Sequence, residues 1–279
     1  MALKSFAKIN LTLNVNKKTK NGLHDIQSIY CLVNKFDTIY IKKNQDKNYD
    51  NISFTGTYSK YIDRSKNSVK AILDILRNNK LISNYYNIKI NKRIPVFGGL
   101  GGGTSNAAII FQHLIKKKIK KDLLQKISSK IGSDFFLFFH NQGFLKDLST
   151  VTKFNKNYQL NFLLIYPNIK CSTMKIYSKV KRYSKKETVK IESLKSKKKF
   201  IDHIIKSNND LQSIVEKEHP VIRKLLLDIY KTKGCFLSRM SGSGSVCYGL
   251  FNNNRSSKAA LKKLRKKYPK FSFSIAKTI

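Results

Sequence analysis

The chain has 279 residues, a formal net charge of +40 at pH 7 and a hydrophobic fraction of 41%. This length can hold one large domain or two of ordinary size, and the hydrophobic fraction is typical of folded globular proteins. No apolar run approaches the ~18 residues of a membrane span and no leader core follows the first methionine, so we expect a cytoplasmic protein without a membrane anchor. The four cysteines are far apart and form no C-x-x-C pair, which favours free thiols over disulfides or a metal cluster.

The positive charge taken alone would favour nucleic acid or an anionic membrane as a partner. Its lysines, however, are spread along the chain with many Asn and Ile residues, a combination that A/T-rich codons produce. The densest basic runs lack the interleaved aromatic residues that stack on bases, and they lie at 116–121, 195–199 and 262–267. We therefore expect no specific nucleic-acid partner, only weak and salt-dependent adhesion to RNA.

Hydrophobic periodicity predicts alternating strands and helices, which favours an α+β fold. In the first strand, at 6–15, Lys8, Asn10, Thr12 and Asn14 share the face opposite the apolar residues. The other expected strands lie at 26–33, 38–42, 86–90, 135–139, 160–166, 235–237, 246–250 and 271–275. The expected helices lie at 69–77, 104–117, 123–131, 174–180, 200–205, 221–230 and 259–267. A polar stretch at 152–157 predicts a boundary between domains at 1–154 and 155–279, and the lysine-rich segment 181–199 receives no predicted structure.

The segment from Pro95 to Ser105 is the strongest functional signal, because five of the six residues from Gly98 to Gly103 are glycine and a helix pattern follows directly. Glycine lets a ligand approach the backbone N–H groups, and a helix N-terminus attracts anions, so the pattern predicts a phosphate site. A Walker A loop is excluded because Thr104 stands where its lysine should follow, and the dinucleotide and protein-kinase glycine patterns also fail. A flexible linker is the alternative, although a helix does not usually begin at the end of one.

Four other features could carry chemistry, and each has a purely structural alternative. Asp134 precedes an apolar run and needs a partner or a function, since unpaired buried charge is costly, but it could simply cap a turn. Lys8 could be exposed to solvent, and His24 could be an ordinary turn histidine. The small-residue loop at 241–245 could bind a phosphate or form a tight turn. The histidines show no metal-ligand spacing.

In chain order these segments resemble the GHMP small-molecule kinases. The resemblance rests on Ala7-Lys8-Ile9-Asn10-Leu11, Gly22-Leu23-His24, the glycine-rich loop, Gly132-Ser133-Asp134 and Arg239-Met240-Ser241-Gly242-Ser243-Gly244. Within that superfamily the chain is similar to the 4-diphosphocytidyl-2-C-methyl-D-erythritol kinases of non-mevalonate isoprenoid biosynthesis. That choice depends on the lead-in Ile88-Lys89-Ile90-Asn91-Lys92-Arg93-Ile94-Pro95 and on Ser207-Asn208-Asn209-Asp210-Leu211. The resemblance covers nearly the whole chain.

The resemblance implies a ribosomal-S5 domain 2-like N-terminal domain for ATP binding and catalysis and a ferredoxin-like C-terminal domain that closes over the substrate. It implies that ATP, with Mg²⁺, phosphorylates the 2-hydroxyl of the cytidine-diphosphate substrate, with Asp134 taking or orienting the hydroxyl proton and Lys8 keeping Asp134 ionised. The implied ATP-binding residues are Pro95, Val96, Phe97, Gly98, Gly99, Leu100, Gly101, Gly102, Gly103, Thr104, Ser105 and Thr173. The implied substrate-binding residues are Asn10, His24, Tyr177, Gly242 and Ser243, with Tyr177 stacking on the base.

The chain departs from the family pattern at a few positions. Phe97 replaces a loop glycine, Leu23 stands where a tyrosine is common, and Phe136 replaces a proline. A glycine-containing motif is also eroded at 146–150. Two alternatives stay open, namely another GHMP kinase that acts on a different alcohol and a degenerate polyanion-binding protein. The sequence predicts neither the Mg²⁺ ligands nor the oligomeric state.

Overall fold

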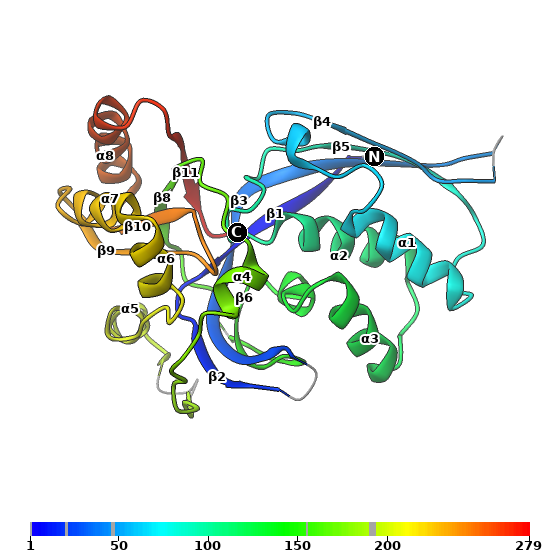
Figure 1. The fold of residues 1–279 in the computed structure, drawn as a ribbon, viewed down its shortest axis with the longest axis horizontal. Helices are drawn as coiled ribbons and strands as arrows, with labels where there is room; N and C mark the ends of the chain where they lie inside the picture. Colours follow the sequence, from blue (N-terminus) through cyan, green and yellow to red (C-terminus); the bar gives the residue numbers. More distant parts are fainter. Residues whose placement is uncertain (1, 20–21, 46–47, 155, 190–193) are drawn as a thin grey trace. The chain divides into compact units, whose positions relative to one another are not determined.

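The structure is a computed structural model that describes residues 2–19, 22–45, 48–154, 156–189 and 194–279 (Figure 1). Its packing divides into two compact units. Unit 1 comprises Met1–Lys8, Lys35–Val96 and Gly101–Phe139, and unit 2 comprises Ile9–Asn34, Phe97–Leu100 and His140–Ile279. Each unit is built from several separate segments of the chain. A division by packing therefore does not test a single boundary in the sequence, and the domain boundary expected at 154/155 stays a prediction.

Unit 1 is a sheet with helices on one face (Figure 1). The end of β3 (His24–Lys43) pairs antiparallel with β5 (Tyr86–Asn91), which pairs parallel with β4 (Asn51–Thr55). β1 (Ala2–Asn10) pairs with β3, and both strands contribute residues to both units. The helical elements are η1 (Ser59–Tyr61), α1 (Ser68–Asn78), α2 (Gly102–Leu114), α3 (Lys121–Ile131) and the 3₁₀ helix η2 (Phe135–Phe139). Asn67 caps α1 by accepting hydrogen bonds from the backbone N–H groups of Val69 and Lys70.

Unit 2 holds the ferredoxin-like arrangement that the resemblance implies. Its four-stranded sheet has the order β11-β8-β10-β9 with every neighbour antiparallel, and α7 and α8 pack against it. The elements are β8 (Asn161–Tyr166), α7 (Pro220–Tyr230), β9 (Cys235–Met240), β10 (Cys247–Phe251), α8 (Asn254–Lys267) and β11 (Ser272–Lys277). The same unit contains β2 (Asn14–Lys18), β6 (Gln142–Asp147), β7 (Thr150–Lys153), α4 (Thr173–Tyr177), α5 (Lys197–Lys206) and α6 (Gln212–Glu218).

Three local predictions were wrong. The apolar run at 135–139 is not a strand but η2, where the N–H of Phe135 bonds to the carbonyl of Gly132 and the N–H of Leu137 bonds to that of Asp134. A short continuous apolar run carries no periodicity, so burial alone cannot distinguish strand from helix. The strands predicted at 26–33 and 38–42 are one strand, β3, because no glycine or proline interrupts them. Sequence reasoning also missed β4, β6, β7 and α6.

The strand predicted at 6–15 is divided between β1 and β2, and its polar residues are buried instead of facing solvent. Lys8, Asn10, Thr12 and Asn14 all have exposed fractions of 6% or less. Each of the first three has a polar partner within its own unit: Lys8 pairs with Asp134, the Asn10 amide donates to the Ser28 hydroxyl, and Thr12 Oγ1 accepts from the N–H of residue 29. Both faces of this segment are therefore enclosed, which alternation in the sequence could not reveal.

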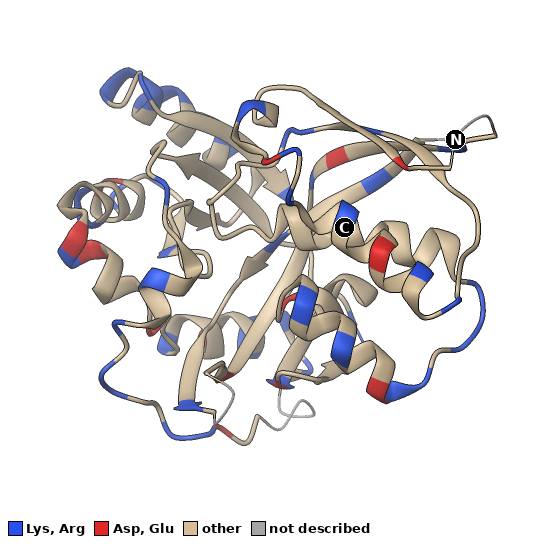
Figure 2. Cartoon of the chain, turned by 45° about the vertical axis from the view of Figure 1, so that its right-hand side comes forward, with Lys and Arg blue, Asp and Glu red and all other residues tan. Residues whose placement is uncertain are grey.

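Basic residues occur on helices, strands and connecting segments, and they are dense on α8 (Figure 2). All four cysteines are free thiols, as predicted, and burial raises the pKa of Cys171 and Cys235 to about 11. Across the described ranges, no helix has the length and apolar character needed to span a membrane. Part of the lysine-rich segment 181–199, residues 190–193, lies outside the described residues.

Candidate active site

Asp134 and Lys8 form an ion pair inside unit 1. Asp134 lies in the short turn between α3 and η2, two residues after Gly132, the glycine with a φ of 141° at which α3 ends. The Lys8 ammonium on β1 lies 3.0 Å from Asp134 Oδ2. The lysine side chain is 3% exposed and the aspartate 23%, so the carboxylate keeps an open side. The structure therefore brings together the two residues predicted to carry catalysis.

The N-terminus of α2 lies beside this ion pair. Gly101 precedes the helix in a left-handed conformation, with φ 67° and ψ 20°, and no side chain in the described structure caps the helix there. The first backbone N–H groups of α2 are thus left for water or a ligand, and the positive end of the helix dipole points the same way. Gly101 and Gly102 are half-buried, whereas Gly103 is exposed. This is the geometry of an anion site.

The space next to Gly101 shows how close the loop comes to the ion pair. A Cβ atom on Gly101 would lie 3.4 Å from Asp134 Oδ2, 3.2 Å from Lys8 Cγ and 2.8 Å from Phe138 Cζ. Only a glycine fits there without moving its neighbours, and only a glycine adopts this φ without strain. The glycine requirement therefore has a physical cause, which is direct packing of the phosphate-type loop on the carboxylate and its lysine.

Sequence reasoning missed a buried polar network under α2. Lys92, at the end of β5, bonds to Asp37 and also donates to Asn106 Oδ1 over 2.7 Å. Asp37 Oδ1 accepts the backbone N–H groups of Arg93 and Ile94. Lys92 and Asp37 are 1% and 0% exposed, and burial holds the pKa of Lys92 below its ordinary value. The network joins the strand that enters the glycine loop to the helix that leaves it.

Ser105 and Thr104 have different surroundings in the first turn of α2. Ser105 is fully buried, and its hydroxyl donates to the carbonyl of Phe6 and accepts from Ser5. Thr104 is half-buried, and its Oγ1 lies 3.0 Å from where a Cβ on Gly132 would be. Ser105 thus ties α2 to β1, whereas the Thr104 hydroxyl lies beside the turn that carries Asp134. Ligand contacts of both residues stay predictions.

The first half of the glycine-rich loop packs within unit 2 against the second small-residue loop. The Ser241 hydroxyl donates to the carbonyl of Gly99 over 3.1 Å, and the N–H of Val246 donates to that of Gly98. A Cβ on Gly99 would lie only 2.1 Å from the carbonyl oxygen of Ser241. Phe97, which replaces a glycine of the family pattern, has a positive φ of 58° and is 48% exposed. The segment 241–245 is therefore more than a turn, because it holds half of the loop.

Several predicted substrate and nucleotide residues gather around the same segment of unit 2. The N–H of Asn10 donates to the Ser241 hydroxyl, and Thr173 and Ser243 share a hydrogen bond of 3.0 Å. Thr173 opens α4, and Gly242 has a positive φ of 55°. The side chain of Asn10 is bonded to Ser28 and is buried. The structure thus brings Asn10, Thr173, Gly242 and Ser243 together with Gly98 and Gly99.

His24 and Tyr177 also meet within unit 2. Their ring centroids are 5.1 Å apart with an interplanar angle of 37°, although the residues come from the start of β3 and the end of α4. Partial burial and the nearby charge of Lys18 hold the pKa of His24 below 6.5, so the imidazole is neutral at physiological pH. Leu23, which stands where a tyrosine is common in the family pattern, is 39% exposed.

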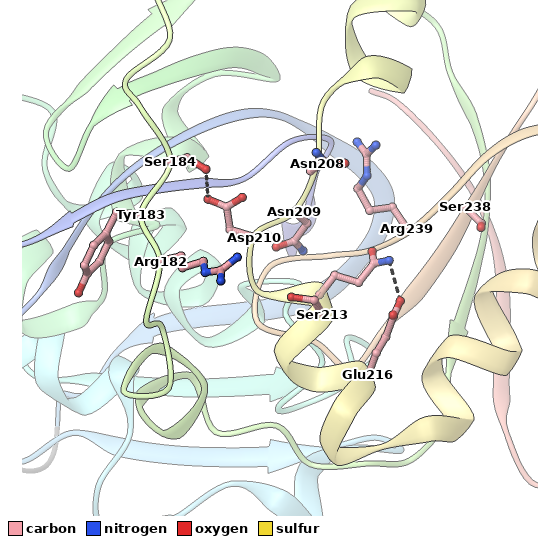
Figure 3. Close-up of a pocket in the computed structure, with 11 residues that line it drawn as sticks. Arg182, Tyr183, Ser184, Asn208, Asn209, Asp210, Ser213, Glu216, Ser238 and Arg239 are labelled. Carbon is pink, nitrogen blue, oxygen red and sulfur yellow. Dashed lines mark hydrogen bonds between the residues drawn. The ribbon is translucent and has the colours of Figure 1, made fainter.

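The segment 207–211, noticed in the sequence only as family support, anchors this region. Asn209 donates its side-chain N–H groups to the carbonyls of Met240 and Gly242. Asp210 accepts from the N–H of Val15 and from the hydroxyl of Ser184, both over 2.7 Å. The same segment borders a cavity of about 520 Å³ that Arg182, Ser213, Glu216 and Arg239 also line (Figure 3). A run of two asparagines and an aspartate was the available signal, because such side chains satisfy backbone groups in irregular segments.

Two family models match the chain. The GHMP kinases N terminal domain matches residues 67–141, and GHMP kinases C terminal matches residues 197–270. The chain is 34% identical over 271 residues to the 4-diphosphocytidyl-2-C-methyl-D-erythritol kinase of Pelagibacter ubique, covering 95% of this chain and 94% of that protein. It is 31% identical over 280 residues to the protein of the same name from Wolbachia sp. subsp. Brugia malayi, covering 96% and 95%.

Solved structures show the same fold. A crystal structure of 4-(cytidine 5'-diphospho)-2C-methyl-D-erythritol kinase superimposes with a TM-score of 0.73 at 19% identity, covering 99% of both chains. The mevalonate kinase of Methanococcus jannaschii superimposes with a TM-score of 0.61 at 19% identity, covering 100% of this chain and 98% of that one. At these identities the likeness concerns the fold alone.

Proposed function

The chain belongs to the 4-diphosphocytidyl-2-C-methyl-D-erythritol kinases, a family of GHMP kinases, and from this premise we propose that it transfers the γ-phosphoryl group of ATP to the 2-hydroxyl of 4-diphosphocytidyl-2-C-methyl-D-erythritol. The observation that carries the proposal is the position of Asp134. Its carboxylate is paired with Lys8 at 3.0 Å and lies next to Gly101, at the uncapped N-terminus of α2. One side of unit 1 thus holds both a base and an anion site.

In the proposed mechanism, the phosphates of ATP lie against the first N–H groups of α2, and the acceptor hydroxyl lies against the open side of Asp134. Asp134 accepts or orients the proton of that hydroxyl while its oxygen attacks the γ-phosphorus and the bond to ADP breaks. Lys8 pairs with the carboxylate and offsets negative charge on the transferring group. The fully buried stem of Lys8 holds its ammonium in place, which favours a precise geometry.

The helix end is too weak to hold a triphosphate by itself. A single charge at a helix terminus gains about 0.3–1 kcal/mol, and about 2 kcal/mol when partly buried. Mg²⁺ takes oxygen ligands and binds through one or two protein groups together with substrate phosphates. The partly exposed Asp134 carboxylate and the Thr104 hydroxyl beside Gly132 fit that donor set. When bound, Mg²⁺ would neutralise phosphate charge.

The cytidine end of the substrate is assigned to the residues of unit 2. His24 and Tyr177 supply an imidazole and an aromatic face in contact with each other. Because its pKa lies below 6.5, His24 is neutral at physiological pH and can both donate and accept a hydrogen bond. The N–H and hydroxyl groups of the segment 241–245 are assigned to the diphosphate, supported by its contact with Asn10 and Gly99.

A coupled assay of ADP release tests the reaction. We expect ADP release with 4-diphosphocytidyl-2-C-methyl-D-erythritol but not with mevalonate, with homoserine or without an acceptor. Asp134→Asn should lower kcat by about 10²–10⁴-fold, the range for a positioned acid or base, with a much smaller change in the KM for ATP. Asp122→Asn, an exposed acid in the first turn of α3, is the matched control and should behave as wild type.

Turnover of another alcohol in place of the cytidylated substrate would show that the chain is a GHMP kinase of different specificity. Polyanion binding without any phosphoryl transfer would show a degenerate binding protein. Wild-type kcat in Asp134→Asn would refute the role of the carboxylate while leaving the substrate assignment standing.

A further inference from the structure

We propose that Tyr183 is a specificity-determining residue that supplies a stacking face for the pyrimidine base of the substrate. This inference rests on the proposed function, because it places the base at His24. Tyr183 belongs to the lysine-rich segment 181–199, for which the sequence predicted no structure and no role. In the structure its ring lies 6.3 Å from that of His24, centroid to centroid, with an interplanar angle of 29°.

The segment that follows Tyr183 is held in place by hydrogen bonds to β2, to β3 and to Asp210 within unit 2. The N–H of Ser184 donates to the carbonyl of Val15 over 2.9 Å, and its hydroxyl donates to Asp210. Further along, the backbone of Glu187 exchanges two hydrogen bonds with the Gln27 side chain, of 2.8 and 2.9 Å. Val15 and Gln27 are 160 or more residues away in the sequence, and Asp210 is 26 residues from Ser184. The contacts are therefore tertiary contacts.

A second anchor comes from charge. Lys186 pairs with Asp25 over 2.8 Å, and Asp25 directly follows His24 in the chain. The Asp25 side chain is only 8% exposed, so it depends on such a partner. Tyr183 is therefore held near His24 by the residues that directly follow it, which are bonded to other elements at 184 and at 186–187. Its ring position follows from this anchoring and is not an accident of a free chain.

The Tyr183 ring is available to a ligand. It is 44% exposed, although it contacts His24, and Figure 3 shows it turned to the side opposite Arg182 and Asp210. Together with Tyr177 it gives His24 two aromatic neighbours, from α4 and from the segment that follows α4. Aromatic rings at interplanar angles of 29° and 37° to a neutral imidazole offer flat apolar faces that suit an uncharged base such as cytosine.

The same arrangement explains how the chain tolerates Leu23. A leucine offers no aromatic face, so Leu23 supplies no stacking surface next to His24. Tyr183 supplies an aromatic face at His24 from a different part of the chain. Base-aromatic stacking contributes about 1–3 kcal/mol per base, which corresponds to roughly 5- to 150-fold in affinity.

The test compares the affinity for cytidine diphosphate with that for inorganic pyrophosphate, which lacks the base. In Tyr183→Ala, calorimetry should show CDP binding weakened by about 5- to 150-fold, whereas pyrophosphate binding should stay within about twofold. Tyr183→Phe keeps the aromatic face and should bind CDP nearly as wild type does. The matched control is Tyr230→Ala, which removes a tyrosine of α7 that is 57% exposed.

The kinetic constants should show the same selectivity. In Tyr183→Ala, the KM for the cytidylated substrate should rise and the KM for ATP should stay unchanged. Unchanged CDP affinity in that variant would overturn the inference, and so would an equal loss for CDP and pyrophosphate, which would mean that Tyr183 only holds the fold. The wild-type protein tests the proposed function separately. If it binds CDP but does not phosphorylate the substrate, the proposed reaction is refuted. The Tyr183 variants still test the stacking role in that case. Failure of wild type to bind CDP would refute both.

Discussion

Replacing Gly101 by alanine tests whether the glycine loop and the catalytic pair form one packed structure. The residue has a φ of 67°, and a left-handed conformation costs a non-glycine residue about 1–2 kcal/mol. Its new Cβ would also lie 2.8 Å from the buried ring of Phe138, and overpacking of this kind costs about 1–3 kcal/mol. Alanine recovers about 0.4–1 kcal/mol by restricting the unfolded chain. We therefore expect Gly101→Ala to lower the free energy of unfolding by about 1–4.5 kcal/mol.

The same variant should also lose activity. The Cβ would lie 3.4 Å from Asp134 Oδ2 and 3.2 Å from Lys8 Cγ, so the loop and the ion pair cannot keep their present spacing. A displacement of about 1 Å can cost about 10²-fold in rate, and we expect kcat to fall by at least about tenfold. Urea denaturation and the ADP-release assay measure the two effects.

Gly103→Ala is the control for stability. It lies on the same helix turn, has no positive φ, and its Cβ would meet only the Ser68 hydroxyl, at 3.2 Å. Its free energy of unfolding should change by less than about 1 kcal/mol, since alanine also favours the helix. If Gly101→Ala matched wild type in both stability and kcat, the packing of the loop on Asp134 would be refuted.

Three further predictions follow from particular residues. Asp37→Asn removes the buried partner of a lysine and should lower the free energy of unfolding by about 3–5 kcal/mol in urea titrations, whereas little change would show that the network is not structural. Phe97→Gly relieves a left-handed conformation at a half-exposed side chain and should raise the free energy of unfolding by about 0.5–1 kcal/mol, measurable as a higher Tm. Burial, the largest cause in each case, lowers the pKa of His24, His113 and His140, so below pH 6.5 the unfolded chain takes up protons that the folded chain refuses. Stability to urea should therefore fall as the pH drops from 7 to 5, and a rise over that range would contradict the assignment.

Local signals predicted much of the fold correctly. The helices α1 and α3 and the strands of the ferredoxin-like sheet were predicted from periodicities within a few residues. The run at 135–139 failed because it has no polar alternation to read. Its actual conformation is set by packing of Phe135 on Phe111 of α2, at 5.5 Å, which is a contact between distant positions.

The candidate site likewise combines residues that the sequence indicated with residues that only the structure revealed. The order of the motifs along the chain singled out Lys8, Asp134 and the glycine loop. Considered alone, Lys8 could have been a solvent-exposed lysine and Asp134 a turn aspartate. The buried pair of Asp37 and Lys92, 55 positions apart, had no local signal. Tyr183 likewise became meaningful only when tertiary contacts brought its ring to His24.

The amino-acid sequence by itself determined the kind of chemistry, because five glycines within six residues directly before a helix predict a phosphate-type loop from local sequence alone. Only the tertiary structure decided which side chains lie at that loop, which polar groups are buried and which aromatic rings meet. The reason is physical: backbone conformation depends on neighbours in the chain, whereas burial and pairing of charges depend on residues that folding brings together from far apart.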